Sequence, residues 1–317
     1  MSITRACRRL TILVSLICLG NASAGGRTPV PSAPAAPLLV LTDAFTKFYN
    51  ATAQLPEGER VRRFHVDFAA LLPGFYAPRE RTDAAYDALI AKSLQNFPAI
   101  RDRYAQVARE FPKAFEQGQK NFRTAFPDYR LDMPVYLLHS LGEMDGGTRE
   151  IDGRTIAIFG ADVIARIHSP DTIKPFLDHE LFHIYHSHYF PECDPVWCAV
   201  WTEGLAVYVA ARLNPGATDV QLLLTQPRPI RPEIEPRLKE AMCALRAKLE
   251  STDRDDYARF FFSRSAGALP PRAGYFLGYL IAARIGATMP LQQMAKLPPD
   301  QVKPLLLDAI ASFGACA

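Results

Sequence analysis

Long apolar runs are scarce in this sequence of 317 residues. The clearest one, Leu10–Leu19, is too short for a stable membrane anchor, and no later stretch approaches the roughly twenty apolar residues of a transmembrane helix. This run follows Arg5, Arg8 and Arg9 and precedes the small residues Ala22-Ser23-Ala24, which is the order of a secretory signal. We therefore predict a signal peptide over residues 1–24 and no membrane span.

An excess of charge of either sign is also absent. The chain has 36 Lys and Arg against 33 Asp and Glu, and three of the arginines lie in the predicted signal, which leaves 33 basic against 33 acidic residues. Because counterion release on nucleic acid needs a basic surface, we expect neither a nucleic acid nor an anionic membrane as a partner.

Cysteine is rare, with six residues, and two of them fall in the predicted signal. An even number in an exported chain predicts disulfides, and the remaining cysteines allow three pairings. We favour Cys193–Cys198 and Cys243–Cys316, because the first pair brackets Asp194-Pro195 in a loop. We expect an exported protein, periplasmic or secreted, and leave its export route open between general secretion, twin-arginine export and lipoprotein processing.

Histidine is sparse as well, with 7 residues, yet two of them stand in the pentapeptide His179-Glu180-Leu181-Phe182-His183. On a helix this spacing puts both imidazoles on one face, where they can reach one ion. Glu180 would lie beside the ion as a general base. A third protein ligand leaves one position open for catalysis, and Glu203 on the next helix fits that need. We predict one zinc ion held by His179, His183 and Glu203.

The surroundings favour this interpretation over a purely structural His/Glu cluster. Residues Ile173–Tyr189 have the pattern of an amphipathic helix, and Val200–Leu213 is an apolar helix in which an unpaired Glu203 would be costly to bury. His186 follows closely and can be an alternate ligand or a proton shuttle, but we favour a solvated histidine.

These residues resemble the gluzincin clan of zinc metallopeptidases, especially the predicted zinc-dependent protease family DUF2268. The motif His179-Glu180-x-x-His183, the downstream Glu203-Gly204-x-Ala206 and the segment Gly274–Tyr279 carry the resemblance, which covers about Val135 to Ile285. One position departs, because the thermolysin-like branch has an acidic residue where this chain has Val207. A partner that orients a metal-binding histidine must then come from elsewhere.

The resemblance implies an α+β fold, a mostly helical zincin-like catalytic domain with a small antiparallel sheet ahead of the HExxH helix. It also implies cleavage of a peptide or protein substrate. We expect Glu180 to carry the proton, and a phenol to stabilise the oxyanion, Tyr279 as first choice and Tyr275 as second. Simple aromatic packing is the alternative for both tyrosines. Two other functions stay open: a zinc-dependent hydrolase of a non-peptide substrate, and a non-catalytic zinc-binding or assembly protein.

Proline and glycine divide the rest of the chain. Residues 25–41 are predicted to be a flexible Pro-rich leader, 42–130 an N-terminal helical subdomain, and 131–317 the catalytic subdomain. We expect four or five helices over Thr42–Phe126, interrupted at Pro56, Pro73-Gly74, Pro98 and Pro112. Short strands are expected at Val135–Leu138 and Thr155–Phe159. The second strand is either an edge on which a peptide can pair or a core layer.

Overall fold

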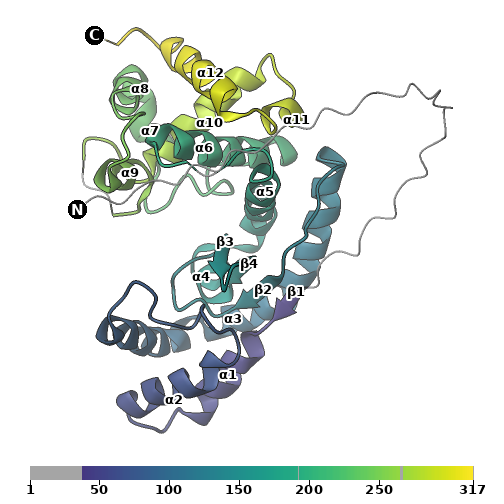
Figure 1. Cartoon of the computed structure of the whole chain (residues 1–317), viewed down its shortest axis with the longest axis vertical. Helices are drawn as coiled ribbons and strands as arrows, with labels where there is room; N and C mark the ends of the chain where they lie inside the picture. Colours follow the sequence, from purple (N-terminus) through teal and green to yellow (C-terminus); the bar gives the residue numbers. More distant parts are fainter. Residues whose placement is uncertain (1–37, 192, 265–266, 317) are drawn as a thin grey trace, which may run out of the picture. The chain divides into compact units, whose positions relative to one another are not determined.

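A computed structural model describes residues 38–191, 193–264 and 267–316 (Figure 1). The predicted signal and residues 25–37 of the predicted leader lie outside the described residues. The first half contains β1 (Leu38–Val40), α1 (Thr42–Ala51), α2 (Glu57–Ala69), α3 (Asp83–Ala125), β2 (Val135–Leu138), β3 (Thr148–Ile151) and β4 (Arg154–Gly160). It is followed by α4 (Ala161–Ile167), α5 (Pro170–His186), α6 (Val196–Leu213), α7 (Arg231–Ile234), α8 (Leu238–Arg246), α9 (Arg254–Phe261), α10 (Ala273–Gly286), α11 (Leu291–Met294) and α12 (Pro299–Ala311). The fold is therefore α+β and mostly helical, as predicted.

The N-terminal helices are fewer and longer than expected, because α3 continues through Pro98 and Pro112. A proline inside a helix costs about 3 kcal/mol, since it removes one hydrogen bond and clashes with the preceding turn. Against this, α3 buries one aromatic ring after another along one face, and each buried ring contributes roughly 1.5–3 kcal/mol. These rings are Phe97, Tyr104, Phe111, Phe115 and Phe122, all no more than 2% exposed. Packing outweighs the local penalty, so our prediction of breaks at these prolines was wrong.

The sheet is mixed, and our prediction of an antiparallel sheet was wrong. Its strand order is β1-β2-β4-β3, with β1, β2 and β4 parallel and only β3 antiparallel to β4. The two-residue turn Asp152-Gly153, with positive φ at both positions, makes the β3–β4 hairpin. The other pairs are joined by longer crossover connections, which parallel strands require.

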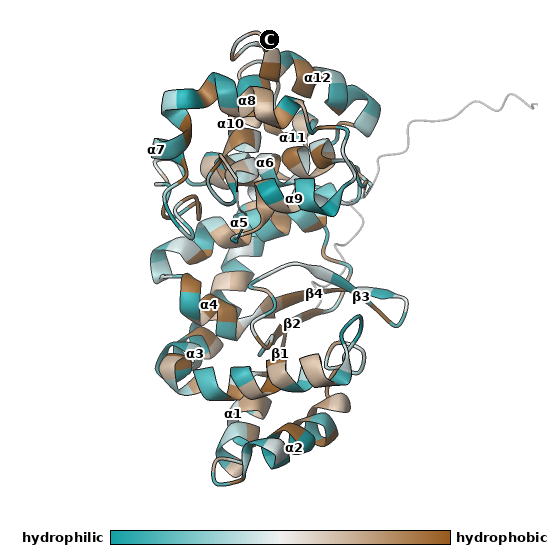
Figure 2. Cartoon of the chain, turned by 90° about the vertical axis from the view of Figure 1, so that its left-hand side faces the viewer, coloured by the Kyte–Doolittle hydropathy of each residue, from teal (hydrophilic) through white to brown (hydrophobic). Residues whose placement is uncertain are grey.

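The position of β4 also differs from one of the two roles considered for Thr155–Phe159. This strand lies between β2 and β3, and Ile156 to Gly160 are buried without alternation, as in a strand covered on both faces. The edge strand beside it is β3 instead. Figure 2 shows this difference, with hydrophobic β2 and β4 inside the sheet and hydrophilic β3 at its edge.

Part of the predicted leader is ordered in the sheet. Leu38, Leu39 and Val40 form β1, which pairs with Val135 to Leu137 of β2. The backbone N–H of Leu41 donates to Leu137 O at 2.8 Å and extends this pairing. The apolar residues that end the Pro-rich segment thus form a strand, which corrects the prediction of a flexible leader for residues 38–41.

Helices α6 and α10 make the most extensive helix contact among the described residues. Gly204 of α6 and Gly278 of α10 face each other so closely that a Cβ on either would overlap the backbone of the other helix. Glycine is required here because only a residue without a side chain allows two backbones to approach in this way. The contact places the first turns of α10 beside Glu203.

Helix α6 is long and apolar enough to cross a membrane by length and composition alone. However, 67% of this segment is buried inside the protein, and core helices pass the same test. The helix also carries a predicted metal ligand. We regard α6 as the central helix of the core.

Both predicted disulfides are present. Cys193, in the loop between α5 and α6, is bonded to Cys198 in the first turn of α6, with a Cα–Cα distance of 6.0 Å. Cys243 of α8 is bonded to Cys316, with a Cα–Cα distance of 5.4 Å. The second bond joins residues 73 positions apart and ties the C-terminal segment to α8. Disulfides persist in oxidising compartments, so this pairing suggests an exported protein.

The C-terminal end of α5 is fixed by Asp128, which lies between α3 and β2. Its carboxylate accepts hydrogen bonds from Tyr185 Oη at 2.9 Å, Tyr189 Oη at 2.8 Å and Lys296 Nζ at 2.6 Å. Burial alone would raise the pKa of Asp128, but the hydrogen bonds from Lys296 and the two tyrosines lower it to about 2. This carboxylate therefore joins three separate segments around the end of α5.

We predict that Asp128 makes stability depend on pH in acid. Because its pKa is below the ordinary 3.8 in the folded state, its contribution is complete above pH 3.8 and is lost as the pH falls toward 2. The carboxylate is 44% exposed, so we expect Asp128→Asn to cost only about 0.5–1 kcal/mol at pH 7. Urea unfolding from pH 7 to pH 2 should show this difference shrinking. A difference that stays constant over this range, or one that Asp132→Asn reproduces, would contradict the assignment.

Candidate metal centre

Helix α5 presents the HExxH segment from a well-defined start. Pro170 occupies its first turn, where proline is tolerated, and Ser169 N–H donates to Thr172 Oγ1 at 3.0 Å. On the inward face of this helix, Phe176, Ile184 and Tyr185 are at most 3% exposed. The predicted helix is confirmed, with both boundaries three residues earlier in the chain. Its opposite face is free to carry the two histidines.

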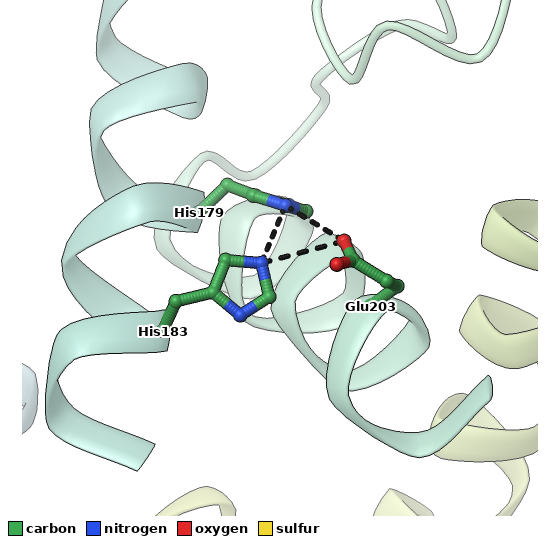
Figure 3. Close-up of side chains that lie close together, drawn as sticks. All are labelled: His179, His183 and Glu203. Atoms are coloured by element: carbon green, nitrogen blue, oxygen red, sulfur yellow. Dashed lines mark hydrogen bonds and ion pairs between the residues drawn. The ribbon is translucent and has the colours of Figure 1, made fainter. Parts of the chain in front are cut away.

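The three predicted metal ligands meet at one point. His179 and His183 lie on consecutive turns of α5, and Glu203 reaches them from α6 (Figure 3). The two Nε2 atoms are 2.9 Å apart, and Glu203 Oε2 lies 3.4 Å from His179 Nε2 and 3.3 Å from His183 Nε2. This group can hold a metal ion.

The size of this triangle fits a tetrahedral cation. With bonds of about 2.0–2.2 Å from a metal to nitrogen and oxygen, ligand atoms at tetrahedral angles are roughly 3.3–3.5 Å apart. Two of the three edges match this value, and the third is shorter by a few tenths of an ångström. A small shift of one imidazole completes the fit.

The charges of the three groups are coupled. Burial alone would raise the pKa of Glu203, but the charge of His183 and hydrogen bonds with both histidines hold it well below its usual range. Burial alone would lower the pKa of His183, but Glu203 raises it to about 9, whereas burial lowers the pKa of His179. Glu203 is thus an anion in an apolar helix, and the protonated His183 balances its charge. A cation bound to the three ligands would take the place of that proton.

Glu180 lies beside this triangle, in close contact with the loop that connects β2 and β3. Burial raises the pKa of Glu180 to about 8; the charge of His183 opposes this, and those of Asp145 and Glu203 add to it. A Cβ on Gly146 would lie 2.7 Å from Glu180 Cγ and 2.8 Å from its Cδ. Glycine at this position therefore lets the loop lie directly against Glu180, which stays partly exposed to the cleft.

The ligands open into a cleft of about 630 Å³, a size common for ligand sites. Its wall is formed by the loop from Asp145 to Arg149, the α5–α6 connection with its disulfide, the loop from Gln221 to Leu223, and the start of α10. The cleft thus brings together segments from both halves of the chain.

Of the two predicted tyrosines, Tyr275 lines this cleft, whereas Tyr279 is not among the described residues that do. Burial, with the charge of Glu203, raises the pKa of Tyr275 well above its usual range. The Arg272 guanidinium lies 4.4 Å from the centre of its ring. Tyr279 instead packs near Tyr208, with ring centres 6.3 Å apart. The structure therefore brings Tyr275, our second choice, into the described cleft wall.

His186 differs from its sequence-based interpretation. It is 2% exposed, its ring stacks between Phe182 and Phe190, and its Nδ1 lies 2.8 Å from Ala295 O. Burial lowers the pKa of His186 to about 4, so the ring is neutral near pH 7. The prediction of a solvated histidine was wrong, because residues four apart on α5 form one buried stack.

The departure at Val207 leaves the metal-binding rings without an acidic partner from that position. Val207 is 2% exposed and lies in the cleft wall. Within the described part of the chain, no carboxylate bonds to Nδ1 of His179 or His183.

Two charged residues that line the cleft, Asp145 and Arg272, were not predicted as site residues from the sequence. The only local pattern at Asp145 is the Gly-rich turn that follows it.

Comparison of the chain with models of protein families, with curated proteins and with solved structures returned no match. The geometry of His179, His183 and Glu203 is what supports a metal centre.

We predict that a divalent cation stabilises the protein through this group. Zn²⁺ at about a hundred times its dissociation constant should add roughly 2.7 kcal/mol to the free energy of unfolding, and a chelator should remove this gain. His183→Ala should lose it because one ligand is missing, whereas His188→Ala, which changes an exposed histidine, should keep it. Thermal unfolding with and without Zn²⁺ measures this, and equal gains in both variants would exclude the site.

Proposed function

We propose that the protein is an exported zinc metallopeptidase of the gluzincin type, resembling the DUF2268 family of predicted proteases. The convergence of His179, His183 and Glu203, with Glu180 beside them at the wall of a cleft, supports this proposal most strongly. A purely structural zinc site is usually closed by a fourth protein ligand. The described residues contribute a group of three, which favours a catalytic role.

The donor set supports zinc as the metal. Two imidazole nitrogens and one carboxylate oxygen are ligands typical of catalytic zinc. Magnesium and calcium prefer sites made entirely of oxygen ligands. Zinc, when bound, acts as a Lewis acid that lowers the pKa of water to about 7 and polarises a carbonyl group.

The residues around the metal have distinct proposed roles. Glu180, beside the three ligands in the wall of the cleft, accepts the proton of the attacking water and delivers it to the leaving amine. Tyr275 keeps its proton, because its pKa is raised, and it donates a hydrogen bond to the carbonyl oxygen as negative charge develops there. Arg272 holds the Tyr275 ring and donates to Leu223 O at 2.9 Å, so it joins the phenol to the loop that borders the cleft.

The position of β3 supports a peptide substrate. This strand pairs with β4 on one side only, and Thr148 and Arg149 line the cleft. The free side of an edge strand offers backbone N–H and C=O groups that an extended peptide can pair with. We assign to β3 the substrate-pairing role that the sequence had suggested for Thr155–Phe159.

Export is proposed from two observations. The disulfides suggest an oxidising compartment, and residues 1–24 have the pattern of a secretory signal. We therefore propose a periplasmic or secreted location. Cell fractionation that finds the chain in the cytoplasm with residues 1–24 still attached would refute this proposal.

Replacement of Glu180 tests the proposed chemistry directly. Glu180→Gln keeps the size of the side chain but removes the proton acceptor, so we expect peptide hydrolysis to fall by about 10²–10⁴-fold while zinc remains bound at one ion per chain. Digestion of a peptide library together with metal analysis measures both quantities. An unchanged rate in a zinc-loaded variant would reject Glu180 as the base.

The two tyrosines provide a matched pair. Tyr275→Phe removes the proposed hydrogen bond to the oxyanion, and kcat should fall by roughly 10²–10³-fold with little change in KM. Tyr279→Phe changes a phenol outside the described cleft wall, so kcat should be unchanged. The opposite result would restore Tyr279, the first choice from the sequence.

A further inference from the structure

A carboxylate outside the metal group, Asp145, is held rigidly in the wall of the cleft. Its backbone O accepts from Gly160 N–H at 2.9 Å, which fixes the loop to the end of β4. Its Oδ1 accepts from Gly146 N–H at 3.1 Å, and its Oδ2 lies 3.0 Å from His168 Nε2. The side chain is nevertheless 28% exposed and lines the cleft.

The support for this carboxylate comes from a fully buried histidine. The His168 side chain is 0% exposed, and its ring lies 4.2 Å from the ring of Phe176, one turn before the HExxH segment. Its Nδ1 is 3.2 Å from Thr172 Oγ1, the hydroxyl that also accepts from Ser169 N–H at the start of α5. The imidazole is thus anchored to the metal helix and cannot follow a displacement of the loop.

The charge of Asp145 acts on two groups. It can pair with His168, and it lies close enough to Glu180 to disfavour the ionised form of that base. Each carboxylate oxygen has two acceptor positions, and His168 and Gly146 each occupy one. The free acceptor positions belong to a side chain that is open to the cleft.

We propose that Asp145 binds a positively charged alkylammonium group of the substrate, adjacent to the bond that is cleaved. This inference rests on the proposed peptidase function and names its substrate class. The ammonium group belongs either to the N-terminus of the peptide or to a lysine side chain.

Two cationic side chains, Arg149 and Arg272, also line the cleft. Each guanidinium donates a hydrogen bond to a backbone oxygen, that of Arg149 to Thr148 O and that of Arg272 to Leu223 O.

The test compares peptides on the zinc-loaded full chain. One pair differs only in acetylation of the N-terminus, and a second pair differs only in lysine against norleucine. Asp145→Asn should raise KM at least about tenfold for the peptides that carry the recognised ammonium group, because a hydrogen bond to a charged group is lost. Values for the neutral partner peptide should change little, and kcat should be retained. The pair that responds identifies the source of the ammonium group.

Two further variants separate recognition from loop support. Asp145→Glu keeps the charge and should retain part of the preference. Asp194→Asn removes an exposed carboxylate of the same cleft and should leave the preference intact. An equal loss for charged and neutral peptides in Asp145→Asn, or no loss for either, would overturn the inference.

Binding to an inactive variant distinguishes this inference from the proposed function. Calorimetric titration of Glu180→Gln with the same peptides should show tighter binding of the ammonium form, and adding Asp145→Asn should abolish the difference. If the wild-type chain cleaves no peptide, the proposed function fails. If the peptides bind Glu180→Gln without a charge preference, or do not bind it, the Asp145 subsite fails.

Discussion

The contact of Glu203 with two imidazoles from the neighbouring helix is the interaction on which the rest of this structure depends. A carboxylate within an apolar core helix is expensive to bury without a partner. Here Glu203 Oε2 is placed 3.3–3.4 Å from both rings, and burial together with the opposing charges sets the protonation of all three groups. The fold must keep α5 and α6 in one relative position, because a displacement of an ångström would separate the ligands.

Several contacts outside the ligand group serve this placement. Gly204 and Gly278 let α10 lie directly on α6, next to the residue that carries the carboxylate. Asp128 holds the C-terminal end of α5, where the two histidines lie, and the disulfide Cys193–Cys198 closes the short connection between α5 and α6. Because interiors are close-packed and transmit displacement, these contacts contribute to the geometry of the metal centre as well as to stability.

The cleft has chemically distinct sides around the three ligands. The loop from Asp145 to Arg149 covers Glu180 and leads into the edge strand β3, while Arg272 and Tyr275 approach from α10. In the proposed function, backbone pairing on β3 is indifferent to side chains, so selectivity would come from groups such as Asp145. A strand that tolerates many peptide sequences, combined with one fixed negative charge, would allow the cleft to recognise a single charged group within many different peptides.

Features that depend on nearby residues could be predicted from the sequence. Two histidines four apart, the intervening glutamate and a carboxylate on the following apolar helix identified the candidate metal ligands, and the loop between Cys193 and Cys198 identified that disulfide, because helical spacing and loop length are short-range properties. Cys243–Cys316, whose partners are 73 positions apart, followed only as the remaining pair. Sheet order, the uninterrupted α3, the burial of His186 and the choice between Tyr275 and Tyr279 were not accessible in this way. Each depends on which distant segments pack together: aromatic burial overrides Pro98 and Pro112, and the packing of α10 on α6 brings Tyr275, but not Tyr279, into the described cleft wall. The pair Asp145 and His168 could not be predicted from the sequence, because only folding brings the turn that carries Asp145 against the buried imidazole at the cleft wall.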